Sequence, residues 1–384
     1  MKRLLLLALV PLALVAGSTG LPADASRAPA PAAASAAAHT RPAHPRYVPP
    51  VKHVFVINIE NKGYGATWGD ASAAPYLAKT LRAKGVLLSS YYATAHNSQP
   101  NYVAQISGQG PNPQMQSDCQ NFSDFQSAAP EQFPGQAVGE GCVFPKSVAS
   151  LPKQLSHVHL RWRGYLQQMR STCQHPTVGT ADPTQHATAK RNYAVRHNPF
   201  VYFHGIIDNR KYCKRHVVQL TRLPKNLEHV RTTPNLVYIT PDLCRDGHDA
   251  PCANGAPGGL KSVDVFMKKW VPRILRSPAF KKNGMLVITA DESDSPFTDS
   301  TACCGEGAGP NSPQPGIIGM GGGHIGALVI SQWSQHNSFS STPYNHYSLL
   351  ASLEEIFRLP KLGYARTVSD RFGLDVYNTD WYTP

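Results

Sequence analysis

Two short apolar segments, far apart in the chain, each end in a pair of oxygen-bearing side chains. A Val-Phe-Val-Ile-Asn-Ile run precedes Glu60 and Asn61, and a Met-Leu-Val-Ile-Thr-Ala run precedes Asp291 and Glu292. Short runs rich in β-branched residues are typical of buried strands in a parallel sheet. Ligands of open α/β sheets bind just beyond the carboxyl ends of the strands. The two pairs are therefore expected to share one edge of a sheet, where they would form an anionic cage for a divalent cation.

Strand-like runs alternate with helical patterns through most of the chain. Residues 235–240 have the composition of a strand, and residues 261–275 carry apolar side chains at near-helical spacing before the run at 285–290. A strand, a crossover helix and a second strand are the parts of a βαβ unit. Shorter strands are expected at 200–203 and 327–330. This alternation predicts an α/β fold of the doubly wound class.

The first 50 residues differ in composition from the rest of the chain. Two basic residues precede the apolar residues 4–15, and small residues follow, which is the pattern of a secretory signal peptide. The apolar run is too short to span a bilayer, and no later stretch reaches that length. We expect a signal peptide at 1–25, a disordered Ala/Pro-rich linker at 26–50 and one folded domain with long loop insertions at 51–384. The protein is therefore expected to be secreted.

Eight cysteines in an exported chain favour disulfide bonds, because the extracytoplasmic environment is oxidising. Their spacing leaves the connectivity open, and the absence of a Cys-x-x-Cys pair argues against a zinc knuckle. Cys244 and Cys252 bracket a short loop and are expected to bond to each other. The adjacent Cys303 and Cys304 are expected to bond to other cysteines.

The chain carries 37 basic and 24 acidic residues, which gives a formal net charge of +13. Such a field attracts anions, for example phosphate esters, acidic lipid surfaces or nucleic acid. The same charge also fits a basic secreted protein that has no such partner. We expect an anionic phosphate-ester substrate, with an acidic lipid surface as a further candidate partner, and no specific nucleic acid. The sequence leaves the oligomeric state open.

A serine lies between the two pairs of oxygen-bearing side chains in the run His-Asn-Ser-Gln-Pro-Asn-Tyr, residues 96–102. A serine hydroxyl needs a base or a metal ion to act as a nucleophile. The chain has no Gly-x-Ser-x-Gly elbow, so we expect Ser98 to be activated by a metal ion. Asn101 follows one helical turn later and can donate its amide to a phosphoryl oxygen, beside a helix that starts near Pro100. The alternative is a serine that only caps a helix.

The oxygen ligands of the expected cage indicate the class of metal ion. Glu60, Asn61, Asp291 and Glu292 offer hard oxygen donors, which suit Mg²⁺, Ca²⁺ or Mn²⁺. A histidine near the cage would favour zinc or iron. The cofactor is therefore expected to be a divalent metal ion whose identity the sequence leaves open.

Three of the 16 histidines follow or precede expected elements and are candidates for the proton donor to a leaving alkoxide. His248 lies in an Asp-Gly-His-Asp run inside the loop between Cys244 and Cys252, and it is the first candidate. His204 follows the strand expected at 200–203, and His346 precedes the last helical pattern.

Taken in order, these motifs resemble the phosphoesterase family of the alkaline phosphatase superfamily, which includes phospholipases C and secreted acid phosphatases. The resemblance is greatest to secreted acid phosphatases of the phosphatidylinositol-3-phosphatase type, and it covers residues 51–365. It implies a three-layer αβα sandwich with a mostly parallel central sheet. It also implies a nucleophile at Ser98, a phosphate ligand at Asn101, histidines near the leaving group, and a metal cage of Glu60, Asn61, Asp291 and Glu292.

The resemblance makes a secreted, metal-dependent phosphomonoesterase the leading hypothesis, working through a phosphoserine intermediate and acting on substrates that include phosphoinositides. The first alternative is a phosphodiesterase of the phospholipase C type, and the second is a non-catalytic secreted protein that binds polyanions. Extra loops rich in Gly, Pro and Cys, at 109–141, 172–197 and 298–323, flank the expected site, and we expect them to decide the choice of substrate.

Overall fold

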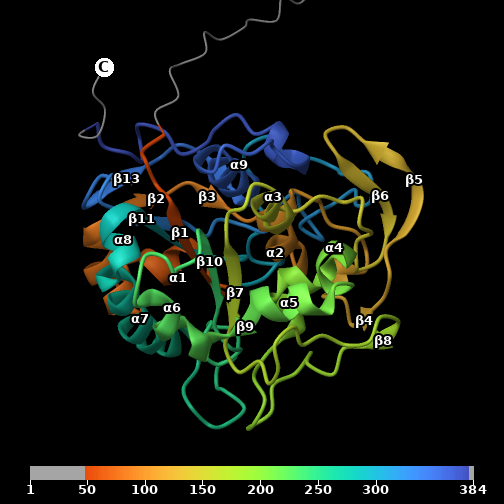
Figure 1. The fold of residues 1–384 in the computed structure, drawn as a ribbon, viewed down its shortest axis with the longest axis horizontal. Coiled ribbons are helices and arrows are strands. Elements are labelled where there is room, and N and C mark those ends of the chain that lie inside the picture. Colours follow the sequence, from red (N-terminus) through yellow and green to blue (C-terminus); the bar gives the residue numbers. More distant parts are fainter. Residues whose placement is uncertain (1–47, 380–384) are drawn as a thin grey trace, which may run out of the picture. The chain divides into compact units, whose positions relative to one another are not determined.

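Within residues 48–379, which the structure describes, an eight-stranded sheet lies between two layers of helices (Figure 1). The protein is represented by a computed structural model. The predicted signal peptide and most of the predicted linker, residues 1–47, lie outside the described residues. The strands follow one another across the sheet in the order β13 (Ser338–Ser340), β2 (Val86–Leu88), β12 (Ala327–Ser331), β11 (Gly284–Ala290), β1 (His53–Ile59), β10 (Leu236–Thr240), β7 (Trp162–Leu166) and β9 (Val217–Gln219).

Strand β1 lies inside the sheet and is parallel to both of its neighbours, β10 and β11. Strands β7 and β9 extend the parallel part beyond β10, whereas β12 runs antiparallel to β11 and to β2. All seven residues of β1 are buried, because helices cover both faces of the sheet. This explains the unbroken apolar sequence of the strand, which does not alternate as a half-exposed strand would.

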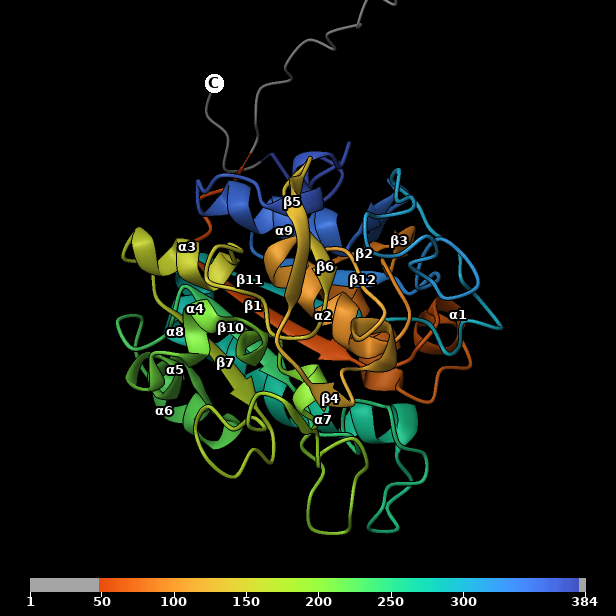
Figure 2. The same cartoon turned by 90° about the vertical axis from the view of Figure 1, so that its right-hand side faces the viewer.

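The helices divide between the two faces of the sheet, as Figure 1 shows. One face carries α1 (Tyr64–Trp68), α6 (Leu223–Leu227), α7 (Gly259–Arg276) and α8 (Pro278–Asn283). The other carries α2 (Ser98–Ser107), α3 (Leu151–His157), α4 (His204–Ile207), α5 (Arg210–His216) and α9 (His346–Ile356). In the turned view of Figure 2, α2 lies in front of β1, and α9 lies beside it. This arrangement confirms the three-layer αβα sandwich with a mostly parallel sheet.

Helices α7 and α2 show two ways in which sequence and burial agree. The apolar side chains of α7 recur along one stripe, which is buried, whereas Val265 on the opposite side is 53% exposed. In α2 all ten residues are buried, polar ones included. Buried polar side chains require partners, and Ser98 and Tyr102 of this helix find theirs in the site described below.

The predicted long loop at 109–141 contains regular structure, so that prediction was wrong in part. It holds a hairpin of β5 (Gln126–Gln132) and β6 (Gln136–Glu140), which projects from the body of the domain in Figure 1. The hairpin has few apolar residues and they do not alternate with polar ones, and β5 is wholly exposed. Its sequence therefore lacks the pattern that predicts a strand. The remaining small elements are η1 (Tyr76–Leu81), η2 (Arg82–Lys84), β3 (Tyr91–Tyr92), η3 (Met115–Ser117), β4 (Asn121–Phe122), β8 (Thr180–Ala181), η4 (Val195–His197), η5 (Pro199–Tyr202), η6 (Leu220–Arg222), β14 (Tyr344–Asn345) and η7 (Gly363–Arg366).

The strand predicted at 200–203 is also wrong, because η5, a short 3-10 helix, occupies most of this segment. Pro199 begins the turn, and the aromatic side chains of the run are buried in the core. Phe200, for example, packs against the rings of Trp162 and Tyr238. A four-residue apolar run contains too little periodicity to separate a strand from a buried turn.

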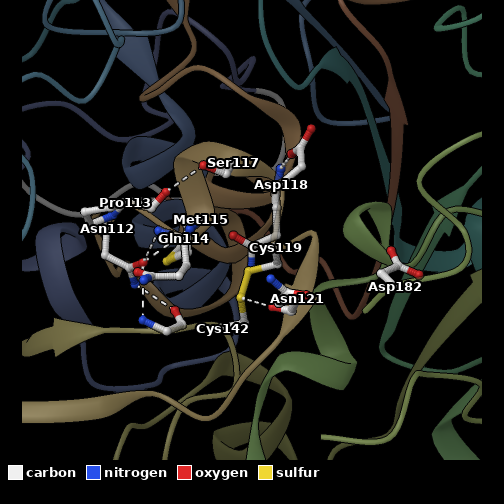
Figure 3. Close-up of a disulfide and its surroundings, with 12 residues drawn as sticks. Asn112, Pro113, Gln114, Met115, Ser117, Asp118, Cys119, Asn121, Cys142 and Asp182 are labelled. Carbon is white, nitrogen blue, oxygen red and sulfur yellow. Dashed lines mark hydrogen bonds between the residues drawn. A yellow bond between two sulfur atoms is a disulfide. The ribbon is translucent and has the colours of Figure 1, made fainter. Parts of the chain in front are cut away.

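Four disulfides join the eight cysteines of the described part of the chain. The predicted bond between Cys244 and Cys252 is present. The prediction for Cys303 and Cys304 was wrong, because these adjacent residues bond to each other. No other cysteine is left for them, since the remaining six form Cys119–Cys142 (Figure 3), Cys173–Cys213 and Cys244–Cys252. Among the described helices, none is both long and apolar enough to cross a membrane.

Candidate active site

The hydroxyl group of Ser98 lies against a carboxylate at the end of β1. Glu60 follows the last residue of β1 and is fully buried. The Oγ atom of Ser98, in the first turn of α2, donates a hydrogen bond of 2.7 Å to Oε2 of Glu60. Tyr102, one turn further along α2, donates its hydroxyl hydrogen to Oε1 of the same carboxylate. Helix α2 thus places two hydroxyl groups on one buried carboxylate.

The two pairs of oxygen-bearing side chains, Glu60–Asn61 and Asp291–Glu292, meet at one edge of the sheet, because β1 and β11 are parallel neighbours. The backbone N–H of Asn61 donates to Oδ1 of Asp291 at 2.9 Å, and its side-chain amide donates to Oε1 of Glu292 at 3.1 Å. Oε2 of Glu292 contacts Nδ1 of His96. Both carboxylate oxygens of Glu292 are therefore engaged by neighbouring side chains.

Two further residues, which the sequence analysis did not select, complete the cluster around Glu60. His197 lies between two carboxylates, with its Nε2 atom 3.3 Å from Oε2 of Glu60 and its Nδ1 atom 3.2 Å from Oδ2 of Asp246. One ligand atom from each of these three buried residues lies within 4.8 Å of the others, so the group could hold a metal ion. The ring of Tyr102 stacks on that of His197, with the centroids 5.4 Å apart.

Asp246 reaches the cluster through the loop that follows β10, the other parallel neighbour of β1. It belongs to the Asp-Gly-His-Asp run, so a sequence signal for it was available. His197 lies within the segment 172–197, which resembled an insertion, and its position became evident only from the fold.

Burial and mutual repulsion dominate the electrostatics of the cluster. Burial raises the pKa of Glu60 well above its usual value, and the nearby carboxylates of Asp291 and Asp246 raise it further. Burial likewise raises the pKa of Asp246, and it raises the pKa of Glu292 to about 8 although His96 opposes the change. The concentration of buried negative charge would be relieved by a cation.

Two buried oxygen atoms in the cluster have no hydrogen-bond partner among the described residues. They are Oδ1 of Asn61 and Oδ2 of Asp291, and both residues follow the ends of neighbouring strands. Buried polar atoms are rarely left unsatisfied, so each one requires an explanation. Unpartnered oxygens beside carboxylates that repel each other are the donor set that a hard divalent cation prefers.

Asn101, the predicted phosphate ligand, has its side-chain amide engaged by the chain that precedes α2. Its Oδ1 atom accepts hydrogen bonds of 3.0 Å from the backbone N–H groups of Thr94 and Ala95. Its Nδ2 atom donates to the carbonyl oxygens of Ala95 and Asn97. The amide holds the loop that positions Ser98, and its role as a phosphate ligand stays a prediction.

The three candidate histidines occupy different settings. His248 borders the cluster: its side chain is 34% exposed, its Nδ1 atom lies 2.8 Å from Oδ1 of Asp249, and its ring lies 5.8 Å from the ring of His197. His346 is fully buried, and its Nε2 atom contacts the backbone oxygen of Asp291 at 2.6 Å.

Burial lowers the pKa of His346 to about 4, so its ring is neutral and donates from Nε2 to this backbone oxygen. His204, on α4, instead pairs with Asp124 and Asp208, each at 2.7 Å. Within the described residues, both ring nitrogens of His204 are engaged by these two aspartates, away from the cluster. The structure therefore brings His248 and His346 to the site and leaves His204 in a separate ion pair.

The fold has a counterpart among solved structures. A protein of the alkaline phosphatase superfamily from Vibrio parahaemolyticus superimposes with a TM-score of 0.50 and 12% sequence identity, covering 81% of this chain and 67% of that one. At this identity the likeness concerns the fold alone. It agrees with the sandwich described above.

The chain belongs to the Phosphoesterase family, whose model matches residues 70–360. A phosphate-repressible acid phosphatase of Penicillium chrysogenum is 24% identical over 285 residues, 74% of this chain and 54% of the relative. A phosphatidylinositol-3-phosphatase of Mycobacterium tuberculosis is 23% identical over 318 residues, 83% of this chain and 81% of the relative. The chain thus spans about half the length of the fungal relative. The family resemblance of the sequence motifs is confirmed.

Proposed function

We propose that the protein is a secreted, metal-dependent phosphomonoesterase that uses Ser98 as its nucleophile. The observation that carries this proposal is the hydrogen bond of 2.7 Å from Ser98 to the buried Glu60, at the edge of the sheet where Asp246 and Asp291 also lie. Membership of the Phosphoesterase family supports hydrolysis of phosphoric esters. The names of the relatives, acid phosphatases and a phosphatidylinositol-3-phosphatase, favour a phosphatase over a phosphodiesterase.

The residues at this edge fit a divalent metal ion. Of the predicted cage, Glu60, Asn61 and Asp291 would hold it, because Asn61 and Asp291 carry buried oxygen atoms without a partner and Glu60 is a buried carboxylate beside them. The overlapping group of Glu60, His197 and Asp246 would border this ion rather than replace the cage. When bound, such an ion neutralises negative charge and favours the ionised form of a serine hydroxyl. Glu292 orients the side chain of Asn61 through its hydrogen bond of 3.1 Å and is in turn held by His96. His346 holds the backbone of Asp291 through the hydrogen bond from its Nε2 atom to the backbone oxygen.

The chain's own residues position the reacting groups. Glu60 and the first turn of α2 hold the Oγ atom of Ser98 in one place. Oγ attacks phosphorus as its proton passes to the carboxylate of Glu60, while the bond from phosphorus to the leaving oxygen breaks. His248, which is partly exposed at the border of the cluster, is placed to give the leaving oxygen a proton. Water then attacks phosphorus, the bond from phosphorus to Oγ breaks, inorganic phosphate leaves, and Oγ takes its proton back from Glu60.

The preferred substrates are anionic phosphomonoesters, with phosphoinositides among them. The relative from Mycobacterium tuberculosis supports the second part by its name, and the net charge of +13 supports attraction of anions. Four disulfides in the described chain support action outside the reducing cytoplasm.

Hydrolysis of three substrates tests the proposal: p-nitrophenyl phosphate, bis-p-nitrophenyl phosphate and phosphatidylcholine, each with and without a chelator and with divalent cations restored one at a time. We expect the monoester to be hydrolysed fastest, the chelator to abolish this activity and one of the cations to restore it. Faster turnover of phosphatidylcholine than of any monoester would establish the phospholipase C alternative. Absence of all three activities after metal loading would favour a non-catalytic polyanion-binding protein.

A further inference from the structure

A buried arginine borders the cluster, and the mechanism proposed above does not use it. Arg196 belongs to η4 and directly precedes His197, and its side chain is 3% exposed. Burying a guanidinium group is costly unless hydrogen bonds and opposite charges compensate for the lost hydration. The partners of Arg196 therefore indicate what it is for.

The contacts of Arg196 leave its guanidinium only partly committed. One Nη atom donates to the backbone oxygen of Gln185 at 2.9 Å, and the other lies 3.1 Å from Nε2 of His248. The Nε atom lies 3.6 Å from Oδ2 of Asp118, which is longer than an ordinary N–H···O hydrogen bond. A guanidinium has five N–H donors in a planar fork, and this geometry suits the oxygens of a phosphoryl group.

The carboxylate of Asp118 occupies a position where an anion would bind. Its Oδ1 atom accepts a hydrogen bond of 2.9 Å from the backbone N–H of Gln99, the residue after Ser98 in the first turn of α2. The first-turn N–H groups of a helix attract anions through their unsatisfied hydrogen atoms and the helix dipole. Figure 3 shows Asp118 beside Cys119, whose disulfide to Cys142 ties this segment down. An internal carboxylate thus bridges the serine helix and the buried arginine.

We propose that Arg196 binds a phosphoryl oxygen of the substrate, and that Asp118 is the internal anion it exchanges for that oxygen. This inference rests on the proposed phosphatase function. A dianionic phosphoryl group must approach a site that already contains Glu60, Asp246 and Asp291, so a fixed positive charge at the border of the cluster lowers the repulsion. Exchange of Asp118 for a phosphoryl oxygen shortens a long ion pair into a charge-assisted hydrogen bond and frees the N–H of Gln99 for the same ligand.

The test measures the affinity of the metal-loaded full chain for inorganic phosphate by titration calorimetry. Arg196→Gln should weaken binding about 10- to 100-fold, as loss of a hydrogen bond to a charged group does. Arg196→Lys should lose less, because it keeps the charge and gives up the planar fork. Asp118→Asn should bind phosphate at least as tightly as the wild type, because it removes the competing anion. Arg191→Gln, an exposed change five residues away, is the matched control and should leave affinity unchanged.

Metal content and thermal unfolding are recorded for each variant, so that loss of the fold or of the metal is seen separately. Wild-type phosphate affinity in Arg196→Gln would overturn the proposal. If that variant does not fold, wild-type phosphate affinity in Arg196→Lys would refute a contact between the planar guanidinium and the phosphoryl group. Weaker binding by Asp118→Asn, to the level of Arg196→Gln, would show that Asp118 is not displaced. Failure of the wild type to hydrolyse p-nitrophenyl phosphate would refute the proposed function, whereas the arginine is judged by phosphate affinity alone.

Discussion

Three buried carboxylates, Glu60, Asp246 and Asp291, meet at the ends of neighbouring strands although their charges repel one another. Such a group destabilises the fold unless protons or a cation neutralise it. Apolar residues at these positions would stabilise the core better, and the buried strands just before them consist mainly of apolar residues. The cluster is therefore explained by chemistry at this edge of the sheet, and its cost to stability makes it testable.

Asp291→Asn tests the metal cage at the level of one residue. The change removes a charged ligand and keeps the shape, so the purified variant should lose bound metal and phosphatase activity. In the presence of a chelator it should unfold at a higher temperature than the wild type, because repulsion among the buried carboxylates is relieved. Elemental analysis and thermal unfolding provide both readings, with the exposed Asp70→Asn as the control. Wild-type metal content in Asp291→Asn would show that the cage lies elsewhere.

His346 makes stability depend on pH. Burial lowers its pKa from 6.5 to about 4, so the unfolded state binds a proton that the folded state does not bind in this range. The free energy of unfolding should therefore fall as pH drops from about 6.5 to about 4, by up to about 3 kcal/mol from this residue.

His346→Gln should remove that part of the slope, measured by urea unfolding across the pH range. A change of the exposed His157 to Gln on α3 should leave the slope as it is. An unaltered slope in His346→Gln would show that other groups cause the pH dependence.

At the scale of elements, the sequence predicted the strands on which the site depends. The runs before Glu60 and Asp291 form β1 and β11, and the strand predicted at 235–240 is β10, Leu236–Thr240. These strands are buried on both faces, so their composition alone identifies them. Residues 200–203 were wrongly predicted as a strand, and the exposed hairpin of β5 and β6 was missed, because short or solvent-exposed segments lack a clear hydrophobic period.

The candidate site was predictable in part for the same reason. Four site residues lie next to strands or helices that the sequence predicts clearly, namely Glu60, Asn61, Asp291 and Ser98. Because parallel strands end at the same edge of the sheet, the sequence predicted that these residues lie close together. His197 and Arg196 come from a segment without periodicity and reach the site through tertiary packing alone, which no local pattern records. Asn101 lay in the right motif, but its hydrogen bonds to the preceding loop depend on a backbone path that the sequence does not specify.

The disulfide between Cys244 and Cys252 should matter more for geometry than for stability. It encloses the loop that carries Asp246 and His248, with a sequence separation of 8. Replacing both cysteines by serine should cost about 2–3 kcal/mol of unfolding free energy by loop entropy. It should reduce kcat by a larger factor, because the loop then no longer fixes these side chains.

The bond between Cys173 and Cys213, with a separation of 40, is the matched comparison. Its removal should cost more stability, since the enclosed loop is longer, and less activity. Equal losses of kcat in the two double variants would contradict a positioning role for the shorter bond. Equilibrium unfolding gives the stability of each double variant, and steady-state kinetics on the same preparations gives its kcat.

At the scale of the whole molecule, the net charge of +13 predicts how the rate responds to salt. Attraction of an anionic monoester should weaken as salt screens the field, so kcat/KM should fall with rising ionic strength while kcat changes little. The monoanionic bis-p-nitrophenyl phosphate should show a shallower dependence than the dianionic monoester. A kcat/KM that is independent of salt would show that the charge lies away from the site.

Trapping the covalent intermediate tests the central claim most directly. The metal-loaded enzyme is mixed with a phosphomonoester, quenched in acid within the first turnover, digested and mapped by mass spectrometry. We predict one phosphoryl group on the peptide that contains Ser98. Ser98→Ala should show no label and lose several orders of magnitude in kcat, whereas the exposed Ser117→Ala should behave as the wild type. Label on another residue, or wild-type turnover by Ser98→Ala, would contradict the account.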